Sequence, residues 1–160
     1  DAVLIPEIPF EIDSVCEKIA DREAHGRRFS IVVVAEGARP RGGDLVIKGD
    51  EIGREVLLGG IGERVAAGIR DGTGKETRTV VLGHIQRGGR PSTFDRLLAL
   101  RFGAAAVRLI QEGRFNHMVA LDPPRVRAVP LEEATSRLKT VPLDSDTVMT
   151  ARDLGICFGD

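Results

Sequence analysis

Residues 30 to 35 read Ser-Ile-Val-Val-Val-Ala. A short, continuous run of β-branched residues is typical of a strand that is covered on both faces in a parallel sheet. Residues 2 to 5, Ala-Val-Leu-Ile, form a second run of this kind. Between the two runs, apolar residues recur at helical spacing, and Gly26 stands where such a helix would end. These apolar residues are Ile12, Val15, Cys16 and Ile19. The pattern predicts a βαβ unit.

The same alternation of helices and strands continues along the chain. A second helical stripe is followed by the turn residues 71–74 and by a predicted strand at 77–82. A third stripe ends at Gly113, and residues 118–121 read as another buried strand. The second stripe is Leu57, Ile61, Val65 and Ile69, and the third is Phe94, Leu97, Leu98, Phe102, Ala105, Leu109 and Ile110.

After residue 122 the pattern is weaker, because prolines interrupt it. We expect two short helices there, at residues 131–138 and 145–154. Taken with the earlier elements, this predicts an α/β fold with one or more doubly wound, mostly parallel sheets and flanking helices.

Composition narrows the functional class. With 160 residues, of which 42% are hydrophobic, the chain can bury one core and corresponds to one domain or part of one. The net charge is -1 and aromatic residues make up 4%, which argues against a partner that is a nucleic acid or a membrane surface. A nucleic-acid domain built on Arg125 and Arg127 is therefore a weak alternative.

Targeting signals and cysteine usage predict a soluble, cytoplasmic protein. No apolar run approaches the about 20 residues of a membrane span, and no signal peptide is evident. Cys16 and Cys157 have no metal-ligand spacing, so we expect reduced thiols and no metal site. The chain opens inside an apolar run at Asp1 to Ile5. We therefore interpret the chain as a piece of a longer protein.

The strongest chemical signal is the segment 76–89, Glu-Thr-Arg-Thr-Val-Val-Leu-Gly-His-Ile-Gln-Arg-Gly-Gly. Ligands of α/β sheets bind beyond the carboxyl ends of strands, where this segment would place His84 and Arg87. Arginine offers a planar fork of donors that matches a phosphate, and adjacent glycines let the backbone approach an anion. The composition therefore indicates a phosphate site. The alternative is that Arg78 and Arg87 form surface ion pairs and that His84 is an ordinary loop histidine.

The motif around this segment resembles the signature of the phosphofructokinase family. The resemblance is carried by residues 82–89, Leu-Gly-His-Ile-Gln-Arg-Gly-Gly, followed by Pro91 and by Phe-Asp-Arg at 94–96. Residues 5–7 and 33–37 resemble the same family at the expected distances upstream. The ending at 144–155 is similar to that of longer-tailed bacterial members.

The resemblance implies roles for four residues. His84 and Arg87 would hold the 6-phosphate of fructose 6-phosphate, and Arg78 would reach the same phosphate from a neighbouring subunit. Glu36 would accept hydrogen bonds from sugar hydroxyls, which suits a carboxylate; without the resemblance it would be an exposed charge at a strand end. The protein would be a homo-oligomer, either a dimer or a tetramer.

A second basic cluster follows the first predicted helix. In the family the matching stretch contributes to an allosteric effector site, which here would comprise Asp1, His25, Arg27 and Arg28. From composition alone these cations would form a solvated turn at a helix C-terminus, where the helix dipole favours them.

The resemblance also predicts which groups this chain does not carry. The intact enzyme would be a phosphotransferase of glycolysis that uses Mg²⁺ and either ATP or pyrophosphate, bound mainly by an N-terminal half. The Gly-rich phosphate loop and the segment with the catalytic aspartate do not occur in the sequence. We therefore expect no catalytic residue in this chain and no activity from it alone. The alternative is a stand-alone module that binds a sugar phosphate or a nucleotide.

The family's threading predicts three segments. Residues 1–85 would belong to the second, sugar-phosphate binding lobe, residues 86–136 to the first lobe, and residues 137–160 to a tail that returns to the second lobe.

Overall fold

The computed structural model describes residues 1–44 and 60–160, which form two compact units. Unit 1 comprises residues 1–81 and 140–160, and unit 2 comprises residues 82–139. The chain therefore leaves unit 1 once and returns to it once. Whether the two units correspond to two lobes of a larger enzyme stays a prediction.

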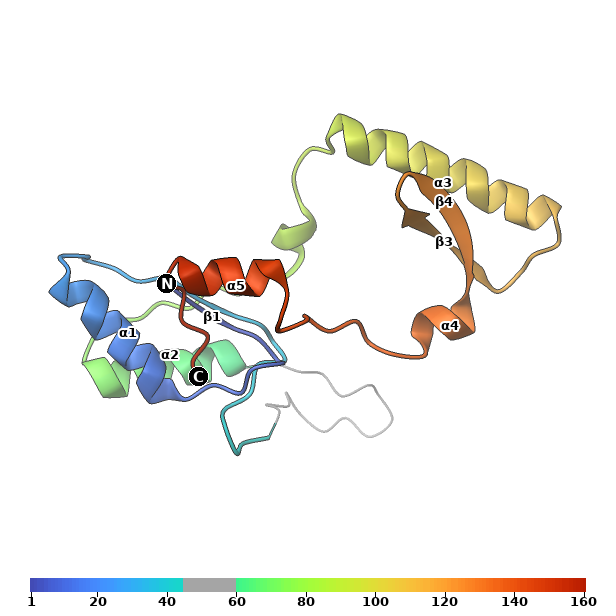
Figure 1. The fold of residues 1–160 in the computed structure, drawn as a ribbon. Helices are drawn as coiled ribbons and strands as arrows, with labels where there is room; N and C mark the ends of the chain where they lie inside the picture. Colours follow the sequence, from blue (N-terminus) through green and yellow to red (C-terminus); the bar gives the residue numbers. More distant parts are fainter. Residues whose placement is uncertain (45–59) are drawn as a thin grey trace. The chain divides into compact units, whose positions relative to one another are not determined.

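Unit 1 is built on the predicted βαβ unit (Figure 1). Strands β1 (Ala2–Leu4) and β2 (Val32–Val34) pair in parallel and are joined by helix α1 (Ile12–Ala24). The β-branched and aliphatic runs thus become strands, although each strand is shorter than the run that predicted it. Residues 156–160 add a further stretch on the other side of β1, where Val3 N donates to Cys157 O over 2.8 Å.

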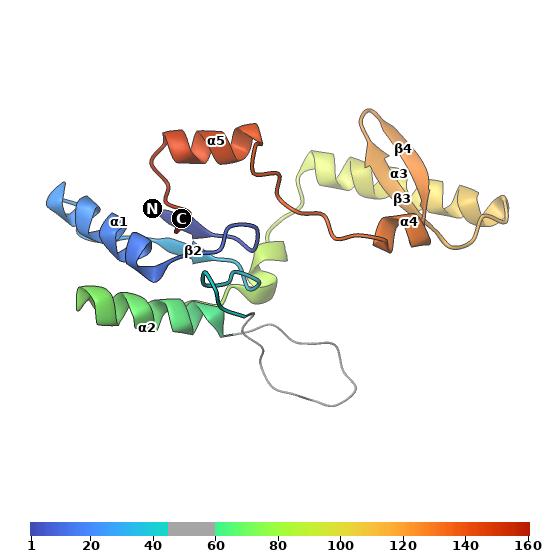
Figure 2. The ribbon, with the colours of Figure 1, turned by 60° about the horizontal axis from the view of Figure 1, so that its bottom comes forward.

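Helices cover both faces of this small sheet. Alternation along β1 directs Ala2 and Leu4 towards a core that is shared with α1 and with helix α2 (Ile61–Thr73). Val3 faces the other way, towards helix α5 (Asp146–Asp153). Figure 2 shows α5 on the opposite side of the strands from α1 and α2. Unit 1 therefore has the layering expected of an α/β protein.

Close packing between α1 and α2 depends on glycine. A Cβ on Gly68 would lie 2.7 Å from Cγ1 of Ile12, and one on Gly72 would lie 2.8 Å from Sγ of Cys16. The two predicted apolar stripes meet at this contact through the buried residues Val15, Ile19, Ile61, Val65 and Ile69. Leu57, which we assigned to the second stripe, lies outside the described residues. Burial at this contact raises the pKa of the Cys16 thiol.

Unit 2 consists of a long helix, a hairpin and two short helical turns. The elements are η1 (Gly83–Arg87), α3 (Thr93–Gln111), β3 (His117–Asp122), β4 (Arg125–Pro130) and α4 (Leu131–Thr135). Strands β3 and β4 pair in antiparallel register from His117 and Pro130 to Asp122 and Arg125. One side of α3 packs on this hairpin. No helix in the described ranges combines the length and the apolar character that a bilayer crossing requires.

Two features differ from the fold that we predicted from the sequence. The described residues form two two-stranded sheets, of which one is parallel and the other antiparallel, so the pairing is not mostly parallel. Residues 77–82 form no strand, because no described strand offers them a hydrogen-bonding ladder; Val80 and Val81 are 74% and 85% exposed. Thr77 is held instead by α2, where its Oγ1 donates to Ala66 O over 3.2 Å.

An ion pair fastens residue 160 to α5. The two guanidinium nitrogens of Arg152 donate to the two carboxylate oxygens of Asp160 over 3.1 and 2.5 Å, and the guanidinium carbon lies 5.0 Å from the centre of the Phe158 ring. The hydrogen bond from Arg152 lowers the pKa of Asp160.

We expect Asp160→Asn to destabilise unit 1 modestly at neutral pH, by about 0.5–1 kcal/mol, because water still reaches both side chains. Since the folded-state pKa is depressed, this contribution is present above the unfolded pKa of about 3.9 and is lost as the pH falls through the folded pKa. Urea unfolding at pH 7 and pH 3 measures it. The control is Asp153→Asn, which changes an exposed acid in α5, the helix that carries Arg152. A difference between Asp160→Asn and the parent that persists unchanged at pH 3 would contradict the assignment.

Candidate functional site

The predicted phosphate ligands His84 and Arg87 lie together on η1. This segment is a 3₁₀ helix, in which side chains three residues apart are eclipsed. His84 and Arg87 are three residues apart and therefore lie on the same side of the turn. Both are exposed, and in the described part of the chain neither side chain has a hydrogen-bond or ion-pair partner. The turn thus presents an imidazole and a guanidinium side by side to solvent.

Backbone hydrogen bonds between residues three apart fix the conformation of this turn. Ile85 N donates to Leu82 O, and Gly88 N donates to Ile85 O, each over 3.0 Å. A Cβ on Gly88 would lie 3.1 Å from Ile85 O, so a larger residue there would crowd the turn. Gly89 has φ of 100°, a conformation that favours glycine. The two glycines therefore let the chain turn sharply behind Arg87.

Helix α3 begins a few residues after these glycines. Ser92 is the N-cap residue, and its Oγ accepts from Asp95 N over 3.2 Å. The Asp95 carboxylate accepts in return from Ser92 N over 2.8 Å and from Ser92 Oγ over 2.7 Å. This reciprocal arrangement is a capping box. The hydrogen bonds from Ser92 lower the pKa of Asp95.

The two other predicted sugar-phosphate ligands belong to unit 1. Glu36 follows β2 at the carboxyl end of the parallel pair, where Ala35 N donates to Leu4 O over 2.9 Å, and its side chain is exposed. Arg78 donates from Nε and Nη2 to Oε1 of Glu76 over 3.1 and 3.0 Å. Both members of this pair are more than three-quarters exposed, so the pair is weak and Arg78 can leave it at little cost. His84 and Arg87 thus lie together in unit 2, whereas Glu36 and Arg78 belong to unit 1.

The predicted effector residues surround the end of α1. The Asp1 carboxylate accepts from Arg22 Nη1 over 2.8 Å and from Ile31 N over 2.7 Å. Arg22 was missed in the sequence analysis. The available signal was its place in the last turn of α1, because in a βαβ unit that turn lies beside the amino-terminal ends of the strands. The Arg22 Nε is buried and has no hydrogen-bond partner among the described groups. Asp1 therefore has a structural role in joining α1 to β2.

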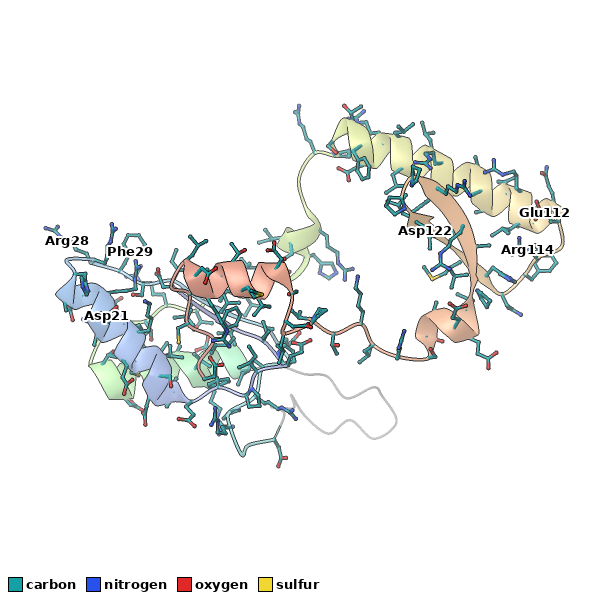
Figure 3. All side chains as sticks on the ribbon, in the orientation of Figure 1. Asp21, Arg28, Phe29, Glu112, Arg114 and Asp122 are labelled. Carbon is teal, nitrogen blue, oxygen red and sulfur yellow. The ribbon has the colours of Figure 1, made fainter. Side chains whose placement is uncertain are left out.

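The remaining effector candidates are more exposed. His25 Nδ1 lies 2.8 Å from Asp21 O and 3.3 Å from Asp21 Oδ1, so the ring closes the C-terminus of α1. Figure 3 shows Arg28 and Phe29 projecting from the turn that follows this helix. Phe29 is 72% exposed. The effector role of Asp1, His25, Arg27 and Arg28 stays a prediction.

The described surface includes two open hollows that these residues do not line. One, of about 450 Å³, lies in unit 2 between α3 and β3, and the other, of about 630 Å³, lies in unit 1 beside the N-terminal end of α1. Neither is lined by Glu36, Arg78, His84 or Arg87. Within residues 1–44 and 60–160, no three histidine, cysteine or acidic side chains cluster so as to hold a metal ion.

Comparison with known proteins gives a consistent set of relatives. The family model described as phosphofructokinase matches residues 1–110. The ATP-dependent 6-phosphofructokinase 1 of a Synechocystis species is 52% identical over 160 residues, which are 100% of this chain and 44% of the relative. The pyrophosphate–fructose 6-phosphate 1-phosphotransferase of Streptomyces coelicolor is 49% identical over 161 residues, with 99% and 45% covered. The chain thus spans less than half the length of these relatives.

A solved structure supports the same grouping. The pyrophosphate-dependent phosphofructokinase of Nitrosospira multiformis aligns with 88% of this chain and 34% of its own, with a TM-score of 0.64 and 25% identity. The corresponding protein of Marinobacter aquaeolei aligns with 98% of this chain at a TM-score of 0.62. At 20% identity, this second likeness concerns the fold alone.

Proposed function

Because this chain belongs to the phosphofructokinase family, we propose that it is the fructose 6-phosphate binding part of a 6-phosphofructokinase. That enzyme transfers a phosphoryl group to the 1-hydroxyl of fructose 6-phosphate and forms fructose 1,6-bisphosphate. We refer below to the full-length protein as the complete enzyme. The observation that carries the proposal is the eclipsed pair His84 and Arg87 on η1, with Gly88 and Gly89 behind it.

This turn has the chemistry to hold a phosphate monoester. The Arg87 guanidinium can donate two parallel N–H bonds to two phosphate oxygens, and His84 can donate a third from its ring. The exposure of both side chains leaves these donors available. Such contacts bind and orient the acceptor sugar, and positioning contributes much of the catalysis in phosphoryl transfer.

Glu36 and Arg78 are proposed to complete the binding of the sugar phosphate. Glu36 lies at the carboxyl end of the parallel strands, where α/β proteins bind ligands, and its oxygens can accept from sugar hydroxyls. Arg78 would come from a neighbouring subunit of a homo-oligomer. Its exposed, easily broken pair with Glu76 supports a role in which it exchanges one anion for another.

The phosphoryl donor is left open. Relatives that carry an ATP-dependent name and a pyrophosphate-dependent name match the chain almost equally, at 52% and 49% identity. The sequence has no phosphate loop, so we propose that the donor and Mg²⁺ bind mainly to the part of the enzyme outside this chain. Mg²⁺ would neutralise charge on the transferred phosphoryl group.

A direct assay tests this function. The complete enzyme and the 160-residue chain are each incubated with fructose 6-phosphate, Mg²⁺, and ATP or pyrophosphate, and fructose 1,6-bisphosphate is measured. We expect product from the complete enzyme and none from the chain. If the full-length protein binds fructose 6-phosphate but forms no bisphosphate with either donor, the protein is a sugar-phosphate binding module and the proposal is wrong.

The shared-site role of Arg78 has its own test. We expect Arg78→Ala, mixed with a His84→Ala and Arg87→Ala double variant, to recover activity, because hybrid oligomers contain sites with all four side chains intact. Random mixing in a symmetric dimer makes such sites roughly one quarter of the total. Activity after subunit exchange measures the recovery, and co-purification of differently tagged variants confirms that exchange occurred. Exchange without recovery would show that Arg78 does not serve a neighbouring subunit.

A further inference from the structure

The capping box at the start of α3 lies only a few residues from the proposed phosphate-binding turn. We propose that Ser92 and Asp95 are positioning residues for the sugar phosphate: they fix the start of α3 and thereby the direction in which Arg87 and His84 are presented. This inference rests on the function proposed above. It adds two residues that do not themselves contact the substrate.

The connection between the turn and the box is short, and two of its four residues are restrained. Only Gly88, Gly89, Arg90 and Pro91 separate Arg87 from Ser92. The Gly88 amide is bonded to Ile85 O over 3.0 Å, and the ring of Pro91 fixes its φ. Most of the rotational freedom in this stretch therefore lies at Gly89 and Arg90. A change in the direction of Ser92 could therefore be absorbed only at Gly89 and Arg90, and whatever they do not absorb reaches Arg87.

The box itself is well formed. A single oxygen of Asp95, Oδ2, accepts from both the amide and the hydroxyl of Ser92 over 2.8 and 2.7 Å. The Ser92 hydroxyl accepts from Asp95 N, and Arg96 N donates to Ser92 O over 3.1 Å. Four hydrogen bonds thus determine the backbone where the loop enters the helix. Without Asp95 two of them are lost, and the first turn of α3 can fray.

The rest of α3 does not depend on the box. The helix has 19 residues, and its row Leu98, Phe102, Ala105 and Leu109 is half-buried on the side that packs on the hairpin. Loss of the N-terminal box should therefore loosen the entry loop while the body of the helix persists. This separation makes the positioning role testable.

The test compares Michaelis constants of the complete enzyme. We expect Asp95→Ala to raise KM for fructose 6-phosphate about three- to tenfold and to leave KM for the phosphoryl donor unchanged. Asp95→Glu keeps a carboxylate at the third helical position, where capping boxes commonly carry glutamate, and should remain within about twofold of the parent. Glu112→Ala, an exposed acid at the other end of α3, is the matched control and should have no effect. Ser92→Ala should repeat the result of Asp95→Ala.

Arg87→Ala is measured in parallel, so that two kinds of failure can be told apart. If Arg87→Ala raises KM for fructose 6-phosphate and neither Asp95→Ala nor Ser92→Ala does, the positioning role is wrong while the proposed site stands. If none of the three raises it, the site is misplaced and the positioning role is overturned with it. An equal rise in both Michaelis constants for Asp95→Ala would indicate general loosening and would also overturn the inference.

Discussion

Replacing Arg87 or His84 by alanine in the complete enzyme is expected to weaken the binding of fructose 6-phosphate about ten- to a hundredfold in each variant. Each side chain is proposed to donate a charge-assisted hydrogen bond to phosphate, which contributes about 1.5–3 kcal/mol. Both side chains are exposed, so the thermal unfolding temperature should not change. KM for fructose 6-phosphate and the unfolding curve are measured together.

Arg114→Ala provides the matched control for these variants. Arg114 is an exposed arginine of the same unit whose Nη1 lies 3.6 Å from Oε2 of Glu112. We expect it to leave KM unchanged, because it is distant in sequence from the turn and has no assigned role. An unchanged KM in both Arg87→Ala and His84→Ala would remove η1 from the substrate site.

The second large effect concerns the 160-residue chain by itself, which we expect to self-associate through α3. Besides the row that faces the hairpin, the helix carries a second apolar row at Leu97, Leu100, Ala104 and Val107. Leu97, Leu100 and Val107 are 56%, 73% and 54% exposed. Burial of a side chain of this size contributes about 1.5–3 kcal/mol, so several exposed side chains in one row favour association.

Sedimentation measures this association. The parent chain should form dimers or larger species, and the double variant Leu100→Lys with Val107→Lys should be a monomer. Leu138→Lys is the control, since Leu138 is 93% exposed and lies outside α3. A monomeric parent chain, or equal association of the double variant and the parent, would contradict the prediction.

The sequence was most informative where apolar periodicity and burial coincide. The stripe through Val15 and Ile19 predicted a helix that packs on a sheet, and both side chains are buried there. The third helix was predicted for the same reason, and Gly113 follows its end with φ of 67°. Such elements are determined by local spacing, which one sequence displays directly.

Elements that depend on a partner strand were predicted less well. Residues 77–82 have the composition of a strand but no described neighbour to pair with. The return strand β4 was missed because Pro123 and Pro124 suggested an end to regular structure, whereas common two-residue hairpin turns carry Asn-Gly or Asp-Gly. The alternation of Arg125 and Arg127 with apolar residues was the signal that could have revealed it.

The candidate site shows the same division. That His84 and Arg87 share one face follows from a 3₁₀ turn, which their spacing permits but does not require. The partner of Asp1 was not predicted, because its contact with Arg22 joins residues that are distant in sequence and depends on the fold. The pair of Arg78 with Glu76 is local, and it agrees with the surface ion pair that was the alternative for Arg78.

The position of residues 156–160 in unit 1 has a consequence for biosynthesis. The backbone of Cys157 forms a parallel β-bridge with Ala2, and Phe158 is buried with Ile8 and Val148. The core of unit 1 therefore combines residues that are far apart in the sequence. Unit 2 is contiguous, whereas unit 1 is divided: strand β1 is made before unit 2, and its neighbour at Cys157 is made after it. Long-range pairings of this kind form slowly. Unit 1 therefore stays incomplete on the ribosome until residues 156–160 are made, and of the two units it is the one that most needs protection from aggregation during translation.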